Sequence, residues 1–133
     1  MTVFVDTSAF LAVLDADDQH HRRAEATWND LLAHQARMLC TNYVLIETFA
    51  LVQHRLGVPA VRTLQEDVLP VLGVEWVGEE LNRAGVSALL TSGRRQLSLV
   101  DCVSFETMRR LGVQTAFAFD RHFEEQGFEV IPA

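Results

Sequence analysis

The chain contains no lysine: its eleven basic side chains are all arginines, and eighteen Asp and Glu residues outnumber them, giving a net charge of −7. A protein that holds nucleic acid by bulk electrostatics needs an excess of Lys and Arg along the binding face. The charge balance therefore excludes that mode and leaves open binding through metal ions and a local arginine patch. The missing lysine also excludes P-loop nucleotide hydrolases, which need a Gly-rich segment followed by Lys, and receiver domains, which use a lysine near their phosphorylation site.

Cysteine is scarce, and long hydrophobic runs are absent. Cys40 and Cys102 are the only cysteines, too few for a disulfide framework or a four-ligand zinc site, so we expect buried, reduced thiols. No run approaches the roughly 20 apolar residues of a membrane span. Residues 1–6 also lack the basic start and apolar core of a signal peptide. We therefore expect a cytoplasmic protein without a membrane segment.

What the chain does have is the composition of a packed globular protein. Of its 133 residues, 49% are hydrophobic and 22% are charged, and no internal repeat or low-complexity stretch interrupts them. This length suits one domain that buries about two-thirds of the surface of its unfolded chain. We expect a single domain over residues 1–133.

Short apolar segments alternate with segments of helical periodicity. The predicted strands are 2–5, 38–41, 74–77, 115–119 and 128–131. The predicted helices are 8–14, a segment through Trp28 to Leu32, 42 to Gly57, one from Pro59 to about 70–73, 79–90, and 98 to Gly112. Because the strands are continuously apolar, they predict an α/β fold: a three-layer α/β/α sandwich with a central, mainly parallel sheet of four to five strands. Trp28 and Trp76 are predicted to lie in the core.

Four acidic residues occupy unusual places in this pattern. Asp6 and Asp120 each end a predicted buried strand, Glu47 interrupts the apolar segment 43–46, and Asp101 follows the largely apolar segment 97–100. Carboxylates are rarely buried unless they are paired, hydrogen-bonded or bound to metal. In parallel sheets, ligands bind beyond the carboxyl ends of the strands, where Asp6 and Asp120 fall. Oxygen-only ligands favour Mg²⁺ or Mn²⁺ over zinc.

Three of these acids also have simpler explanations as helix caps. Asp6 and Asp120 each precede a segment that they could cap, and Ser98 with Asp101 matches a capping box. Glu47 is harder to explain, because the residues three and four positions away on its helix are almost wholly apolar. The four acids together therefore favour a metal site more strongly than any one of them does alone.

A carboxylate-bound divalent cation suits phosphodiester hydrolysis, because it lowers the pKa of bound water and stabilises charge on the phosphate. Asp6 and Asp101 are the preferred direct ligands, and Asp120 completes the site. Glu47 either binds a second ion or orients the water. The paired arginines 94–95 and 109–110 could position an RNA backbone, although solvated helix faces explain such pairs more often. His122 lies near the predicted site and is assigned a structural or surface role.

The order of these motifs resembles the PIN-domain family, and most of all its VapC-type toxins. The matching segments are Val3–Ala9 with Asp6, Glu47 within a helix, Leu97–Cys102 with Asp101, and Phe119–Phe123 with Asp120. The resemblance implies a PIN-like fold and a Mg²⁺- or Mn²⁺-dependent endoribonuclease, with all four acids at the family's catalytic and metal-binding positions. Thr7 or Ser8 would be the polar residue that positions water or substrate beside the first Asp. It also implies an RNA substrate, a homodimer and a cognate antitoxin that blocks the site.

Other functions remain open within this resemblance. A free-standing RNA-processing nuclease would carry the same acids, and a non-catalytic PIN-like module would bind RNA or protein and keep the acids for structure. The small size without an added RNA-binding module favours a toxin. The sequence does not identify the target RNA, because recognition of RNA depends on loops and shape.

Overall fold

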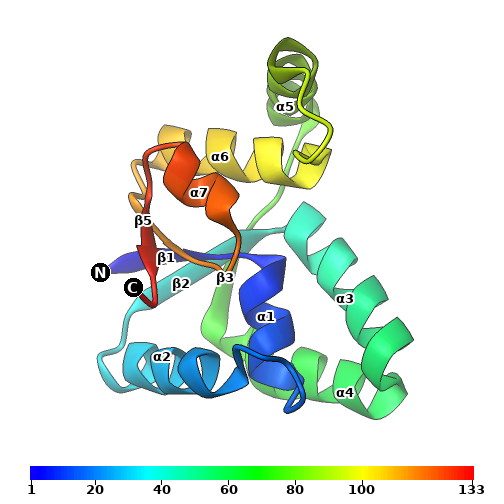
Figure 1. Ribbon diagram of the computed structural model, residues 1–133, viewed down its shortest axis with the longest axis vertical. Coiled ribbons are helices and arrows are strands. Elements are labelled where there is room, and N and C mark those ends of the chain that lie inside the picture. Colours follow the sequence, from blue (N-terminus) through cyan, green and yellow to red (C-terminus); the bar gives the residue numbers. More distant parts are fainter.

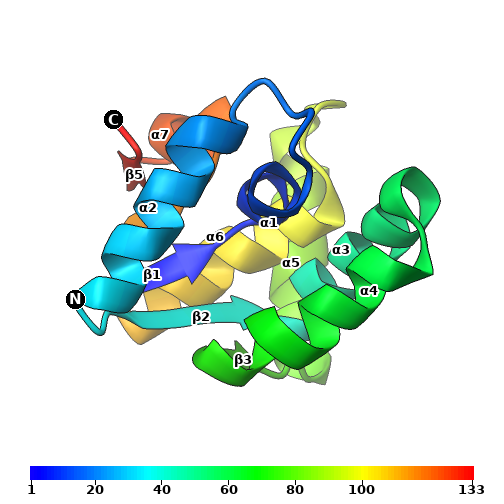
Figure 2. The same cartoon turned by 90° about the horizontal axis from the view of Figure 1, so that it is seen from below.

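The computed structural model describes residues 1–133 and contains one five-stranded sheet in the order β3-β2-β1-β4-β5. All neighbouring strands are parallel. The strands are β1 (Thr2–Val5), β2 (Arg37–Thr41), β3 (Leu72–Glu75), β4 (Thr115–Phe117) and β5 (Glu129–Ile131). Helices α1 (Thr7–Leu14) and α2 (His21–Ala33) cover one face, and α6 (Leu99–Leu111) and α7 (Arg121–Glu125) cover the other (Figure 1, Figure 2). The predicted α/β/α sandwich with a parallel sheet is confirmed.

The remaining helices extend these layers. Helix α3 (Asn42–Leu56) follows β2 directly, and α4 (Val58–Thr63) continues through a π turn (η1, Leu64–Val68) and a 3-10 turn (η2, Leu69–Val71). Helix α5 (Glu79–Ser92) packs on the outer side of α6 (Figure 1). None of these helices combines the length and apolar character that a membrane crossing requires.

The strands carry apolar side chains on both faces because both faces of the sheet lie in the core. Val3, Phe4 and Val5 of β1 are wholly buried, as are Ala116 and Phe117 of β4. Helices cover both sides of the sheet, so the side chains in its centre are buried on both faces. Both cysteines are buried and free, as expected. Burial raises the pKa of the Cys40 thiol to about 12.

Three local predictions need correction. Strand β3 begins two residues earlier than predicted, and Trp76, which follows it, is 73% exposed rather than in the core. β3 is an edge strand, so the chain that leaves it has packed neighbours on fewer sides. Helix α7 was not predicted, because its five residues are too few to show a helical period. The fourth predicted helix is divided into α4, η1 and η2.

The topology brings the first and last acidic motifs together. β1 and β4 are neighbours in the centre of the sheet, and the Asp6 amide donates to the Phe117 carbonyl at 3.0 Å. The chain therefore leaves β1 at Asp6 and β4 shortly before Asp120 at the same edge of the sheet. Residues far apart in the sequence meet there.

Candidate active site

Asp6 lies between the end of β1 and the start of α1, where it caps the helix. Its Oδ2 accepts hydrogen bonds from the Ser8 amide at 3.1 Å and the Ser8 hydroxyl at 2.6 Å. The residue is only 5% exposed, and no hydrogen bond or ion pair engages Oδ1. Burial raises its pKa to about 7; the Ser8 hydrogen bonds oppose this shift, and the charges of Asp101 and Asp120 add to it.

Asp101 occupies the first turn of α6. It forms a complete capping box with Ser98: the Asp101 amide donates to Ser98 Oγ at 3.0 Å, and the Ser98 amide donates to Asp101 Oδ2 at 3.1 Å. Burial raises the pKa of Asp101; the Ser98 amide opposes the rise, whereas the nearby Asp120 carboxylate increases it. The capping explanation is therefore correct, and it does not exclude a metal-binding role, because the cap also holds this carboxylate beside the other acids.

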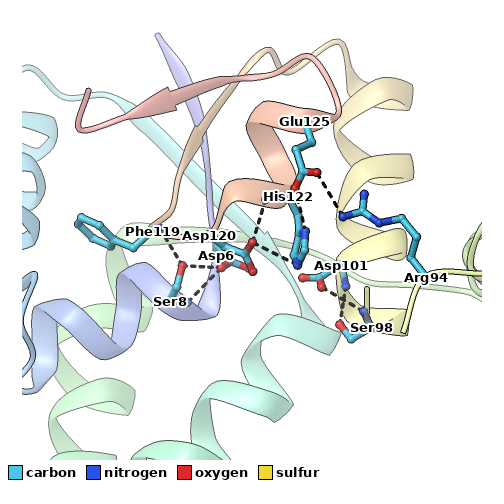
Figure 3. A network of polar contacts seen from close by, with 9 residues as sticks. All are labelled: Asp6, Ser8, Arg94, Ser98, Asp101, Phe119, Asp120, His122 and Glu125. Carbon is cyan, nitrogen blue, oxygen red and sulfur yellow. Dashed lines mark hydrogen bonds and ion pairs between the residues drawn. The ribbon is translucent and has the colours of Figure 1, made fainter. Parts of the chain in front are cut away.

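Asp120 caps α7 and brings His122 into the site (Figure 3). Asp120 Oδ1 accepts from the His122 amide at 2.8 Å and lies 3.5 Å from His122 Nε2. Potential ligand atoms of Asp101, Asp120 and His122 all lie within 4.8 Å of one another. His122 was assigned a surface or structural role from the sequence. Its place two residues after Asp120 is the available signal, but the short helix α7, which brings the ring back to Asp120, is not visible in the sequence.

Glu47 stands apart from this group. It is partly buried on α3 and makes no hydrogen bond or ion pair. The closely spaced potential ligand atoms are those of Asp101, Asp120 and His122 and include neither Glu47 nor Asp6, but the pKa of Asp6 is raised by burial and by the charges of Asp101 and Asp120. Thr48, the neighbour of Glu47, helps to fix α3 against α1, because its hydroxyl lies 3.3 Å from the hydroxyl of Thr7 on α1, which in turn donates to the Val44 carbonyl of α3. The structure thus fixes the position of Glu47 through the helix rather than through a bond to its carboxylate.

The two hydroxyl residues after Asp6 point in different directions. Thr7 is buried and donates to the Val44 carbonyl of α3 at 3.4 Å. Ser8 bonds to Asp6 and also accepts from the Phe119 amide at 2.9 Å, so it joins the ends of β1 and β4 (Figure 3). Of the two, Ser8 is the residue that contacts the acidic site.

The donor set fits a hard divalent cation. Asp6 has no cationic partner although it is buried, and each of the three aspartates is near another negative charge. A bound cation would relieve this repulsion. Carboxylate oxygens suit Mg²⁺ and Mn²⁺, whereas imidazole suits later transition metals, so the three aspartates would hold the ion. An open groove of about 580 Å³ adjoins them and is lined by Ser8, Arg94, Gln96, Phe119, Asp120, Arg121, His122 and Glu125.

Known proteins are similar to this chain in sequence and in fold. The family model described as PIN domain matches residues 3–129. The 23S rRNA-specific endonuclease VapC20 of Mycobacterium tuberculosis is 36% identical over 132 residues, which cover 98% of each chain. Its crystal structure, described as that of a sarcin-ricin loop cleaving toxin, superposes with a TM-score of 0.83 at 34% identity over 95% of each chain.

More distant structures share the fold alone. VapBC2 from Rickettsia felis, bound to a DNA fragment from its promoter, matches with a TM-score of 0.71 at 13% identity, covering 98% of this chain and 97% of that one. FitAcB from Neisseria gonorrhoeae matches with a TM-score of 0.68 at 16% identity, covering 98% and 96%. The matched family model and the similarity to VapC20 along the whole chain lead to one conclusion: this chain belongs to the PIN-domain family and is of the VapC type.

Proposed function

We propose that this protein is a Mg²⁺- or Mn²⁺-dependent endoribonuclease that hydrolyses RNA phosphodiester bonds with a metal-activated water, and that residues 1–133 form one nuclease domain. The observation that carries the proposal is the meeting of Asp6, Asp101 and Asp120 at one edge of the sheet, with no arginine paired to any of them. Helix capping explains each aspartate singly, but it does not explain why the three carboxylates lie together. The endonuclease activity of VapC20 supports the same reading.

The roles of the residues follow from their contacts. Bound Mg²⁺ or Mn²⁺ supplies an activated water and stabilises charge on the phosphate oxygens. Asp6, held by Ser8, and Asp101, held by Ser98, present fixed carboxylates, and Asp120 completes the set from the start of α7. No side-chain nucleophile is needed. Glu47 approaches from α3 and either orients the water or contributes to a second ion.

His122 has a position suited to hydrogen bonding rather than to binding the ion. Its Nε2 lies 3.5 Å from Asp120 Oδ1, and its Nδ1 lies 3.3 Å from Glu125 Oε1. These two carboxylates hold the imidazole ring between them. Such contacts keep the Asp120 carboxylate in one orientation, as outer hydrogen bonds do for metal-binding carboxylates.

The substrate to test first is the sarcin-ricin loop of 23S rRNA. VapC20 is described as cleaving that loop, and the similarity extends along 98% of both chains. A stem-loop also suits a protein of net charge −7, because structured RNA is recognised by shape and unpaired bases as well as by bulk charge. Cleavage of purified ribosomes or of the isolated loop, mapped by primer extension, tests this assignment.

We further propose that the protein is the toxin of a toxin-antitoxin pair, acts in the cytoplasm, and forms a homodimer that a cognate antitoxin inhibits. The same fold occurs in VapBC2 and FitAB, both of which are solved bound to DNA. Expression alone should arrest growth, and co-expression with the product of an adjacent short gene should restore it and yield a stable complex. If growth is normal and no complex forms, a free-standing RNA-processing nuclease becomes the better reading.

The decisive experiment is RNA cleavage with and without EDTA. Wild-type protein should cleave in Mg²⁺ or Mn²⁺ and stop when EDTA is added, and Asp6→Asn should be inactive although folded. Cleavage that persists in EDTA, or in Asp6→Asn, would contradict the metal mechanism. RNA binding without any cleavage would support the non-catalytic alternative.

A further inference from the structure

Arg94 and Glu125 form an ion pair beside the acidic cluster. Arg94 lies in the loop 93–98 between α5 and α6, and its guanidinium lies 3.2 Å from Glu125 Oε2 on α7 (Figure 3). The two side chains are 40% and 44% exposed. The other oxygen of Glu125 lies 3.3 Å from His122 Nδ1. A continuous row of polar contacts therefore runs from Asp120 through His122 and Glu125 to Arg94.

The same residues line the open groove next to the metal site. Arg94 and Arg121 are its two cationic residues, and Ser8 and Asp120 connect it to the catalytic acids. The chain carries a net charge of −7 and only eleven basic side chains, and two of these arginines lie on one groove beside the proposed site, together with Asp120 and Glu125. Arginine binds phosphate oxygens through its planar, forked set of donors.

We propose that this groove holds the sugar-phosphate backbone of the RNA next to the bond to be cut, with Arg94 and Arg121 as phosphate-binding residues. In the free protein, the Glu125 carboxylate forms an ion pair with the Arg94 guanidinium, in the place that a phosphate of the RNA would take. RNA binding then requires Arg94 to exchange Glu125 for a phosphate, so Glu125 lowers RNA affinity. The inference rests on the proposed function, because it takes RNA as the substrate.

A purely structural explanation makes a different prediction. If the ion pair served only to fasten loop 93–98 to α7, removing either partner would break the same bond and harm binding in the same way. If Arg94 binds phosphate, removing Arg94 weakens RNA binding, whereas removing the charge of Glu125 strengthens it. The two single substitutions therefore change the affinity in opposite directions when the RNA backbone lies beside Arg94, and a contact with phosphate also lowers the salt dependence by about one charge.

The test compares Arg94→Gln and Glu125→Gln, both made in an Asp101→Asn background so that RNA is not cut. Binding of a labelled synthetic hairpin with the sarcin-ricin loop sequence is followed by fluorescence anisotropy in Mg²⁺. Arg94→Gln should raise Kd roughly 5-fold or more. The slope of log Kd against log salt concentration should fall by about one unit, which corresponds to the loss of one phosphate contact. Arg121→Gln should act in the same direction. Glu125→Gln should lower Kd roughly 3-fold, and its glutamine oxygen can still accept from His122.

Arg62 and Glu66 provide the matched control. They form an exposed ion pair of 3.3 Å on α4 and η1, on the opposite side of the molecule from α7 (Figure 1, Figure 2). Arg62→Gln and Glu66→Gln change the net charge by the same amounts without touching the groove. They should leave Kd nearly unchanged.

The proposal is overturned if Arg94→Gln and Glu125→Gln change Kd in the same direction, or if their effects do not exceed those of the control pair. If Arg94→Gln does not fold, as judged by thermal unfolding, the tightening by Glu125→Gln decides. Binding is measured with a variant that cannot cleave, so the result for Arg94 does not depend on whether the proposed catalysis is correct. Cleavage by the wild-type protein can likewise be observed even if Arg94 does not bind RNA.

Discussion

The Ser8 hydroxyl joins the two central strands at the site, because it donates to Asp6 Oδ2 at 2.6 Å and accepts from the Phe119 amide at 2.9 Å. Asp6 therefore depends on a residue two positions along the chain for its orientation. Its ionisation depends on the same residue, since the Ser8 hydrogen bonds oppose the rise in its pKa that burial causes.

Ser8→Ala should consequently move the pH dependence of cleavage. Without the hydroxyl, the pKa of Asp6 rises further above about 7, so the acidic limb of the kcat/KM profile should shift to higher pH and activity at pH 7 should fall. Stability should drop by about 1–3 kcal/mol, because the Phe119 amide loses its acceptor. The measurement is a pH–rate profile with Thr63→Ala as control, whose exposed hydroxyl donates only to the Pro59 carbonyl of its own helix. An unshifted profile would contradict this role.

Asp6→Asn should stabilise the metal-free protein at high pH. The pKa of Asp6 is about 7 in the folded state against 3.8 ordinarily, so between these values the folded protein holds a proton that the unfolded chain lacks. Below about pH 4, Asp6 is protonated in both the folded and the unfolded state and does not destabilise the protein. The free energy of unfolding then falls as the pH rises, and the loss is complete above about pH 7. The penalty is on the order of a few kcal/mol. Asn keeps the capping ability of Asp and does not ionise.

Urea unfolding in EDTA at several pH values checks this prediction. The variant and wild type should agree near pH 4 and diverge steadily towards pH 8, with the variant more stable. Added Mg²⁺ should reverse the order at pH 8, because only the ionised wild-type carboxylate binds it. A constant difference at all pH values would mean that Asp6 does not titrate as burial requires.

Asp101 combines a structural and a chemical role that two substitutions can separate. Asp101→Asn keeps an oxygen that can accept from the Ser98 amide and so preserves the capping box, whereas Asp101→Ala removes it. Both variants should lose cleavage. Only Asp101→Ala should also lose about 0.5–2 kcal/mol of stability. If Asp101→Asn retains full activity, the residue is a cap alone.

The sequence predicted the parts of the molecule that repeat a local pattern. The apolar strand before Asp6 and the helix after it are each visible in a few consecutive residues, and the capping box of Ser98 and Asp101 is visible in four. His122 and Trp76 could not be assigned in the same way. His122 depends on the short helix α7, and the exposure of Trp76 depends on β3 lying at the edge of the sheet. Both are consequences of tertiary packing, which no local period encodes.

Glu47 was the hardest acid to explain from the sequence, and the structure separates it from the closely spaced group of Asp101, Asp120 and His122. We expect Glu47→Gln to lower kcat roughly 10- to 100-fold, the usual cost of disturbing an outer residue of a metal site. The affinity for the first ion should change little if the three aspartates hold it, as we propose. Asp101→Asn should instead cause a large loss of affinity for the first ion.

Isothermal titration with Mn²⁺ and single-turnover cleavage distinguish these outcomes, and Glu66→Gln on η1 serves as the control for removal of an exposed carboxylate. If Glu47→Gln weakens the first ion as strongly as Asp101→Asn does, Glu47 is a direct ligand and the side chain must move towards the aspartates when metal binds. If kcat is unchanged, Glu47 has no part in the reaction. A fall in kcat with intact first-ion affinity would assign Glu47 to the water or to a second ion, and the dependence of the wild-type rate on Mn²⁺ concentration would then separate these two roles.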